Sequence, residues 1–154
     1  MNPKHVTVHC SATAPEHDFS YDDLRHAHVT VNGWSDVGYH WYIRQSGERI
    51  ACRPLTRMGA GVRGHNRDNI HICLEGGVNL AGDSVDNYTK AQKDELRLLI
   101  IDMVGQYGIT NGPCGHRDWS PDLNNDGTIQ SNEFIKDCPC FDVRVWWKGV
   151  NQCN

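Results

Sequence analysis

The sequence lacks the features that mark several protein classes. Its 15 lysines and arginines are outnumbered by 19 aspartates and glutamates, and a formal charge of −4 gives no basic surface for nucleic acid. Its most apolar stretch, L-R-L-L-I-I-D-M-V at 96–104, is too short and too charged to span a membrane. The first residues lack the apolar core of a signal peptide. We therefore expect a protein made in the cytoplasm, without a membrane segment or a nucleic-acid partner, that leaves the cell only when something else releases it.

Histidine and cysteine, in contrast, are abundant. The 154 residues match the size of one ordinary domain, and no internal repeat, low-complexity segment or linker divides them. Nine histidines are more than packing requires, and seven cysteines are an odd number. Without a secretion signal, free thiols and metal ligands are favoured over a disulfide framework. The two excesses together indicate a transition-metal site.

The pattern of apolar residues predicts a small α/β domain. K-H-V-T-V-H-C alternates with period two, which places Val6 and Val8 on one face of a strand and His9 on the other. Strands are expected at 4–10, 37–43, 48–53 and 69–75, and helices at 20–28, 90–107 and around 142–148. Residues 59–69 are expected to be a loop and 110–140 largely irregular. The predicted fold is a single domain with a central mixed β-sheet of four or five strands, flanked by helices.

Two zinc sites can be built from the histidines and cysteines. Catalytic zinc has three protein ligands, and His9, at the end of the first strand, could join His116 and Cys138. A local alternative has four ligands, in which Cys114 and Cys140 join His116 and Cys138. Its gaps of a single residue are tighter than those usual between paired zinc ligands. Spacing alone does not choose between the two sites.

The stretch D-L-N-N-D-G-T-I-Q-S-N-E at 122–133 has the spacing of a calcium loop. The sharp turn at position 6 falls on Gly127, and no entering helix is expected, because W-S-P precedes the loop. The alternative is a polar turn built on Asp-Gly. The ligand positions 1, 3, 5, 7, 9 and 12 would be filled by Asp122, Asn124, Asp126, Thr128, Gln130 and Glu133.

Five segments occur in the order found in one enzyme family. The segments are V-H-C-S-A-T (8–13), G-W-S-D-V-G-Y-H-W (33–41), G-H-N-R-D-N-I (64–70), G-H-R-D (115–118) and K-D-C-P-C-F-D-V (136–143). With these segments the chain resembles the zinc-dependent N-acetylmuramoyl-L-alanine amidases of type 2, which include T7 lysozyme-like endolysins and are related to peptidoglycan recognition proteins. The resemblance extends over essentially the whole chain, and the combination of segments is far more specific than any one of them.

The resemblance implies a function and a set of site residues. It implies that His9, His116 and Cys138 bind one catalytic zinc ion, and that Tyr39 and Lys136 assist catalysis. The implied substrate is peptidoglycan, in which zinc-activated water would cleave the amide between N-acetylmuramic acid and L-alanine. We expect one amidase domain over residues 1–154, acting as a monomer on the cell wall after its release.

The sequence departs from the family pattern at three places. The calcium-like segment, about residues 119–134, is an insertion between His116 and the K-x-C-P segment. Gly61 stands where many relatives have a histidine, and His71 stands where a glycine is more usual. These two departures concern contacts with the substrate rather than the metal ligands.

Three other functions remain open at this point. A module that binds peptidoglycan without cutting it is the main alternative, because some relatives lack the cysteine ligand and Gly61 departs from the pattern. A cysteine peptidase would use Cys10 or Cys73 as nucleophile with a histidine base. A calcium-sensing interaction protein is the third, and a single loop without an entering helix argues against it.

Overall fold

The computed structural model describes residues 1–151, so Cys153 lies outside the described part of the chain. It contains a five-stranded sheet in the order β3-β2-β4-β1-β5. Only β3 runs antiparallel to its neighbour, and the sheet is therefore mixed, as predicted. The strands are β1 (His5–Cys10), β2 (Trp41–Ile43), β3 (Arg49–Ala51), β4 (Asn69–Leu74) and β5 (Cys114–Gly115).

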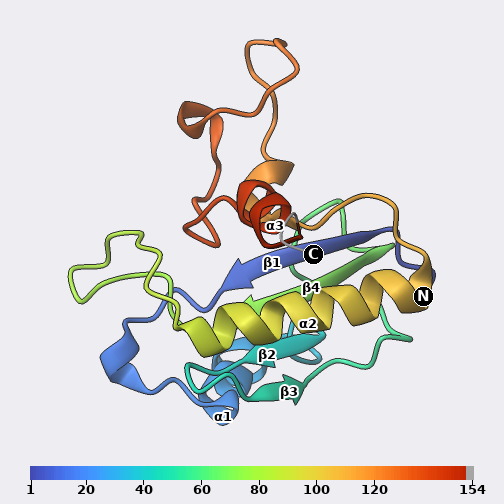
Figure 1. Cartoon of the computed structure of the whole chain (residues 1–154). Coiled ribbons are helices and arrows are strands. Elements are labelled where there is room, and N and C mark those ends of the chain that lie inside the picture. The colour runs from blue at the N-terminus through green and yellow to red at the C-terminus, as the bar shows by residue number, and fades with distance from the viewer. Residues whose placement is uncertain (152–154) are drawn as a thin grey trace.

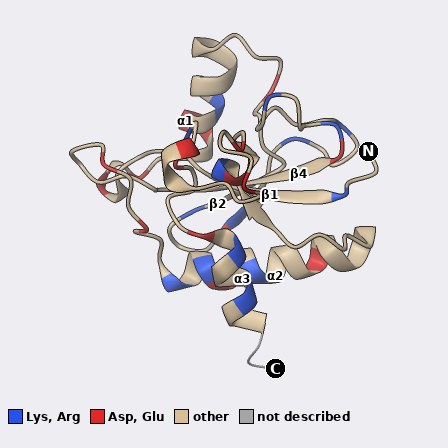
Figure 2. Ribbon diagram, turned by 90° about the horizontal axis from the view of Figure 1, so that it is seen from above, with Lys and Arg blue, Asp and Glu red and all other residues tan. Residues whose placement is uncertain are grey.

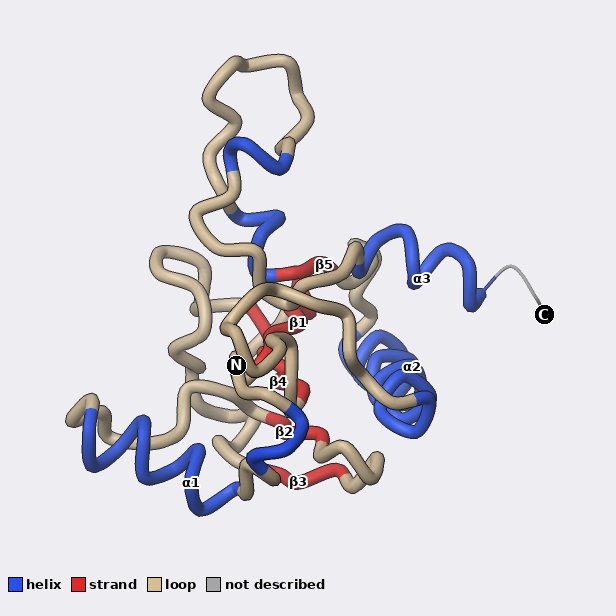
Figure 3. Tube along the Cα trace, turned by 90° about the vertical axis from the view of Figure 1, so that its left-hand side faces the viewer, coloured by secondary structure: helices blue, strands red, loops and turns tan. Residues whose placement is uncertain are grey.

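Helices cover both faces of this sheet. One face carries α1 (Tyr21–Arg25), which continues as a π-helical segment (His26–Val31). The opposite face carries α2 (Lys90–Tyr107) and α3 (Val143–Asn151), and Figure 3 shows the sheet between the two groups. The predicted α/β class and the flanking helices are confirmed.

Strand alternation sorts the side chains of the sheet into two layers. Val6 and Val8 of β1 are fully buried on the α2 face, as their alternation predicted. Each such side chain contributes roughly 1.5–3 kcal/mol through burial. His9 lies on the opposite face, where Cys73 of β4 packs with Leu24 of α1. The main cluster also contains Ile43, Ile70, Ile72, Leu74, Leu96, Leu99, Ile100 and Met103.

The helix over 90–107 has the bounds that its end signals predict. Thr89 accepts a hydrogen bond from the backbone N–H of Gln92, and the Gln92 side chain accepts one from the backbone N–H of Thr89. At the other end Gly108 adopts a left-handed conformation with φ of 62°. Ser20 caps α1 in the same way, with Asp23 as its partner.

The expected strand over 37–43 begins only at Trp41. Two backbone groups explain the difference. The N–H of Gly38 donates to Nδ1 of His28, and its carbonyl accepts from the N–H of Ala60 at 2.8 Å. These bonds tie residue 38 to a helix and a loop rather than to a neighbouring strand.

Other boundaries also differ from those expected. The hairpin strand is confined to 49–51, and the first helical region extends to Val31 instead of ending near 28. The strand β5 lies inside the region expected to be irregular, and two residues are too few to give a periodic pattern. The last helix runs from 143 to 151, slightly beyond the predicted range.

The segment at 119–134, predicted to be an insertion, extends away from the body of the domain (Figure 1). Lysine and arginine are interspersed with aspartate and glutamate over the fold (Figure 2). Within residues 1–151, no helix has the length and apolar character needed to cross a membrane.

Candidate metal centre

The first candidate ligand, His9, is held by the centre of the sheet. Strand β1 pairs in parallel with β4 on one side and with β5 on the other. The His9 side chain is fully buried on the face opposite Val8. A ligand on a central strand is fixed by hydrogen bonds on both of its edges, which suits a metal site.

The second candidate ligand reaches His9 through β5. Pairing of Thr7 with Cys114 sets the register of this strand, and a 3-10 turn begins directly after it at His116. Asp118 stabilises the turn by accepting the N–H of Gly115 at 2.6 Å. The rings of His9 and His116 lie 4.9 Å apart, centroid to centroid, at an interplanar angle of 70°.

The third candidate ligand arrives from beyond the insertion. Sγ of Cys138 lies 3.9 Å from Nδ1 of His9, and the N–H of Cys10 donates to the same sulfur at 3.2 Å. The Cys138 carbonyl accepts the N–H of Arg117 at 2.8 Å, which ties this segment to the turn that carries His116. The three donor atoms of His9, His116 and Cys138 all lie within 4.8 Å of one another.

The chemistry of this donor set fits zinc. Two imidazole nitrogens and one thiolate are ligands that zinc prefers, and three protein ligands are typical of catalytic sites. Burial, followed by the charge of Lys136, lowers the pKa of His116 to about 4. Burial, followed by the neighbouring His71, lowers the pKa of His9 well below its ordinary value. Both rings are therefore neutral near pH 7, as metal ligation requires.

The two predicted catalytic residues both lie near this cluster. The Tyr39 ring precedes β2 and lies 5.0 Å from the His9 ring, centroid to centroid. Burial raises the pKa of Tyr39 well above its ordinary value, so the phenol keeps its proton. Lys136 is exposed and lines a cavity together with His116.

That cavity provides room for a substrate beside the cluster. Its volume is about 570 Å³, and its walls come from the loop after β3, the turn after β5 and the end of the insertion. It is lined by Ala60, Gly61, Val62, Arg63, Asn66, His116, Trp119, Ser120, Ile135 and Lys136.

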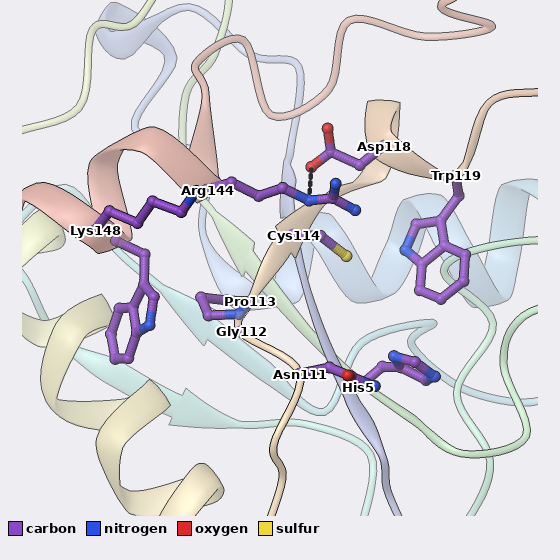
Figure 4. Close-up of a pocket in the computed structure, with 10 residues that line it drawn as sticks. His5, Asn111, Gly112, Pro113, Cys114, Asp118, Trp119, Arg144 and Lys148 are labelled. Carbon is purple, nitrogen blue, oxygen red and sulfur yellow. Dashed lines mark ion pairs between the residues drawn. The ribbon is translucent and has the colours of Figure 1, made fainter. Parts of the chain in front are cut away.

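A second cavity, of about 450 Å³, lies at the β5 edge of the sheet (Figure 4). Arg144 and Lys148 of α3 contribute to it, and Arg144 pairs with Asp118 at 3.7 Å. None of the three candidate metal ligands lines it. The cavity beside His116 is therefore the one that adjoins the candidate chemistry.

The four-ligand alternative does not match the positions of its cysteines. Cys114 faces the backbone carbonyl of Val6 and the hydroxyl of Thr7, both 3.7 Å from its sulfur. Cys140 has its sulfur 4.0 Å from that of Cys10. Among residues 1–151, the only group of histidine, cysteine and acidic donors close enough to share an ion is the three-residue cluster.

The cysteine peptidase alternative is also unfavourable. Its nucleophile would have to be a thiolate. A hydrogen bond with Cys138, together with burial, raises the pKa of Cys10 to about 12. Burial raises the pKa of Cys73 well above its ordinary value. Both thiols stay protonated at neutral pH.

The calcium-like loop does not gather its carboxylates around one point. The two oxygens of Glu133 accept the N–H groups of Leu123, Asn124 and Gln130. Asp126 accepts from the side chains of Asn124 and Gln130, and also from the N–H of Thr128. The predicted ligands therefore bond largely to one another and to the loop backbone. Calcium binding stays a prediction.

The sequence did not identify His71 as part of the site. Its Nδ1 lies 3.0 Å from Nε2 of His9, on the side of that ring away from Cys138. The sequence feature that could have pointed to His71 was its position in a predicted strand, two residues before Cys73. The contact depends on the register between β4 and β1, and the sequence does not give that register.

Comparisons with known proteins identify the family of the chain. The family described as N-acetylmuramoyl-L-alanine amidase matches residues 1–130. The endolysin of Klebsiella phage KP32 is 35% identical over 144 residues, which cover 93% of this chain and 84% of that protein. The endolysin of Escherichia phage T7 is 32% identical over 145 residues, with the same coverage of both chains.

A solved structure agrees at the level of the fold. The endolysin N-acetylmuramoyl-L-alanine amidase LysCS from Clostridium intestinale URNW superposes with a TM-score of 0.74 at 23% identity, covering 98% of this chain and 85% of that one. The family match and the phage relatives extend over most of the sequence. This chain therefore belongs to the N-acetylmuramoyl-L-alanine amidase family.

Proposed function

We propose that this chain cleaves the amide between N-acetylmuramic acid and L-alanine in peptidoglycan, with a zinc ion held by His9, His116 and Cys138. Membership of the amidase family gives the reaction class, the hydrolysis of peptidoglycan. The observation that carries the proposal of zinc is the convergence of three donor atoms within 4.8 Å of one another. The cavity beside His116 would receive the substrate.

The protein's contribution to the metal is a rigid and correctly protonated set of ligands. When bound, zinc supplies Lewis acidity, which polarises a carbonyl and makes water acidic enough to react near neutral pH. The lowered pKa values of His9 and His116 keep both lone pairs available. The Cys138 thiolate would cancel part of the charge of the ion, so other cationic groups are needed at the reacting carbonyl.

Lys136 is suited to supply that positive charge. It lines the same cavity as His116, and its charge contributes to the lowered pKa values of both His116 and His9. Its side chain is exposed, and a lysine ammonium group is carried on a flexible stem, so it can approach a carbonyl oxygen as negative charge develops there. We assign Lys136 to stabilisation of the oxyanion.

Tyr39 is suited to donate a hydrogen bond rather than to act as a base. Burial keeps its phenol protonated, and its ring lies against the His9 ring. A neutral phenol in this place can orient the attacking water or the substrate oxygen. Neither role requires that Tyr39 lose its proton first.

A module that binds without cutting finds no support among these observations. Cys138, which such a module would not need, points its sulfur at His9. We propose peptidoglycan as the partner and the cell wall, after release of the protein, as the place of action. That the chain works as a monomer stays a prediction.

Calcium binding by the insertion is a separate proposal. Gly127 has φ of 84°, as the sharp turn of such a loop requires, and its N–H donates to Oδ2 of Asp122. Oδ1 of Asp122 is buried and makes no hydrogen bond within the described residues. These features support an ion at Asp122, with weak affinity because few carboxylates contribute.

Digestion of purified peptidoglycan tests the proposed activity. Mass spectrometry of the products should show free stem peptides that begin with L-alanine, together with glycan strands that keep intact muramic acid. Phenanthroline should stop the reaction and added zinc should restore it. Products cut within the glycan, or undiminished activity in a sample from which the metal has been removed, would contradict the proposal.

A further inference from the structure

His71 contacts the candidate ligand His9 without belonging to the donor cluster. Both side chains are fully buried, and Nδ1 of His71 lies 3.0 Å from Nε2 of His9. The other nitrogen of His9, Nδ1, faces the sulfur of Cys138 at 3.9 Å. The two nitrogens of His9 are therefore directed to different partners, one to the metal cluster and one to His71.

We propose that His71 is a positioning residue that orients His9 for the metal, an inference that rests on the zinc site of the proposed function. Nδ1 of His9 is the nitrogen that would hold the metal, and the proton of the neutral ring would then be on Nε2. That N–H would donate to Nδ1 of His71. Such a bond fixes both the tautomer and the ring angle of a ligating histidine.

The strand register explains why this contact is rigid. In the parallel pair of β1 and β4, Thr7 lies opposite His71 and His9 lies opposite Cys73. His9 and His71 are therefore diagonal neighbours on one face of the sheet, where long side chains on adjacent strands can reach each other.

His40 holds the backbone of His71 in place. The N–H of His71 donates to Nδ1 of His40 at 2.9 Å, and Nε2 of His40 bonds to the carbonyl of Arg57 at 3.1 Å. The rings of His40 and His71 stack, with their centroids 5.8 Å apart at 10°. Nε2 of His71 makes no hydrogen bond within residues 1–151. In the described part of the chain, the one hydrogen bond of the His71 side chain is thus its contact with His9.

Two glycines make room for the His71 ring. A Cβ atom on Gly61 would lie 2.6 Å from Nδ1 of His71 and 2.9 Å from Nε2 of His9, directly across their contact. A Cβ atom on Gly59 would lie 2.5 Å from Cδ2 of His71. No side chain at either place is compatible with the observed ring. The departures from the family pattern at 61 and 71 are therefore one coupled change, in which a strand residue fills the space that the loop leaves open.

The test compares two isosteres at position 71. Asn places an acceptor oxygen near the position of Nδ1 of histidine, whereas Gln extends past it. Zinc affinity would be measured by competition with a chromogenic chelator, and folding by circular dichroism. We expect H71Q and H71L to bind zinc about 10- to 100-fold more weakly than the unsubstituted chain. H71N should keep most of the affinity.

Gly61 gives a second, independent variant. Gly61→Ala should weaken zinc binding, because its Cβ displaces the His71 ring. The double variant G61A/H71G should lose less zinc affinity than the sum of the two single losses, since the His71 ring at 2.6 Å from the new methyl group is gone and only the approach of 2.9 Å to Nε2 of His9 remains. Gly105→Ala is the matched control, because nothing lies within 4 Å of its added Cβ atom, and it should leave zinc affinity unchanged.

The outcomes separate this inference from the proposed function. Failure of the unsubstituted chain to bind zinc overturns the proposed site and the inference together. Tight zinc binding and full activity in the unsubstituted chain, with equal affinity in folded H71Q, H71L and G61A, overturn only the role of His71. Equal loss of affinity in H71N and H71Q also contradicts it, because the acceptor atom would then not matter.

Discussion

Two parts of this molecule have the residues of a metal site, and only one brings them together. His9 and His116 are fixed by adjacent parallel strands, and the chain returns to place Cys138 within reach of both. The loop at 122–133 has closer spacing in sequence, yet its carboxylates bond to its own amides. The comparison teaches that strand register gathers ligands more reliably than nearness along the chain.

The surroundings of the two parts differ as much as their geometry. His9 is fully buried in the sheet. Leu123 in the insertion is 67% exposed and Ile135, directly after it, is 74% exposed, so these apolar side chains do not anchor the loop on the core. The buried residues there are Ser120 and Glu133, one near each end of the segment. A substitution in the sheet site should therefore have much larger effects than one in the loop.

The largest effect is expected from removal of the sulfur ligand. Cys138→Ser should abolish tight zinc binding and lower kcat/KM by on the order of 10³-fold or more, about 4 kcal/mol of transition-state stabilisation. Metal analysis and a muropeptide assay on the same sample would measure both. Cys114→Ser, in the second cavity, is the control and should retain zinc. A folded, metal-free C138S protein with full activity would remove the distinction between the two regions.

The next effect concerns the charge beside the cluster. Lys136→Ala should retain zinc but lower kcat by roughly 10²- to 10³-fold, because the oxyanion loses a cation that acts mainly in the transition state. Lys148→Ala provides a lysine control on the wall of the second cavity and should leave kcat unchanged. Unchanged kcat in K136A would exclude a chemical role for Lys136.

A smaller effect is expected from His28, whose protonation should lower the free energy of unfolding in acid. Burial lowers the pKa of His28, whose Nδ1 accepts the N–H of Gly38. The unfolded chain therefore takes up a proton at His28 near its ordinary pKa of 6.5, before the folded chain does. The stabilising contribution is complete above this pH and is lost as the pH falls below it.

Urea unfolding of the metal-free chain at pH 7, 6 and 5 would measure this contribution. The free energy of unfolding of the His28→Asn variant should decrease less steeply as the pH falls. The amide oxygen of the new asparagine still accepts the Gly38 N–H, but it does not titrate. The insertion at 119–134 contains no histidine and should add little to the slope. Equal slopes for H28N and the unsubstituted chain would show that His28 is not among the groups responsible.

The smallest effect is expected in the loop. Millimolar calcium should raise the Tm by a few degrees at most, about 1 kcal/mol for a chain of this size, and Asp122→Asn should remove the shift. Zinc affinity should be the same with and without calcium. Calorimetry that detects no calcium binding would leave the loop as a polar turn held by Glu133.

Local signals in the sequence predicted the elements whose causes are local. The capping box at Thr89 and the glycine at 108 gave the bounds of α2, and the alternation of Val6 and Val8 gave the two faces of β1. The start of β2 could not be predicted, because Gly38 bonds to residues distant in sequence.

In the candidate site, too, some features could be predicted from local sequence and others could not. Its donors could be named from residue types and the family resemblance, whereas their distances depend on β5, a strand too short to leave a pattern. His71 was noticed only as a departure from the family. Its contact with His9 follows from the pairing of β4 with β1, which no local signal reports.

The most direct test of the sheet-borne site is X-ray absorption at the zinc edge of the purified protein. Ligation by His9, His116 and Cys138 predicts one sulfur at about 2.3 Å and two imidazole nitrogens at about 2.0–2.1 Å, with the sulfur absent from any zinc retained by C138S. A zinc shell without sulfur in the unsubstituted protein, or one with two or more sulfurs, would contradict this coordination.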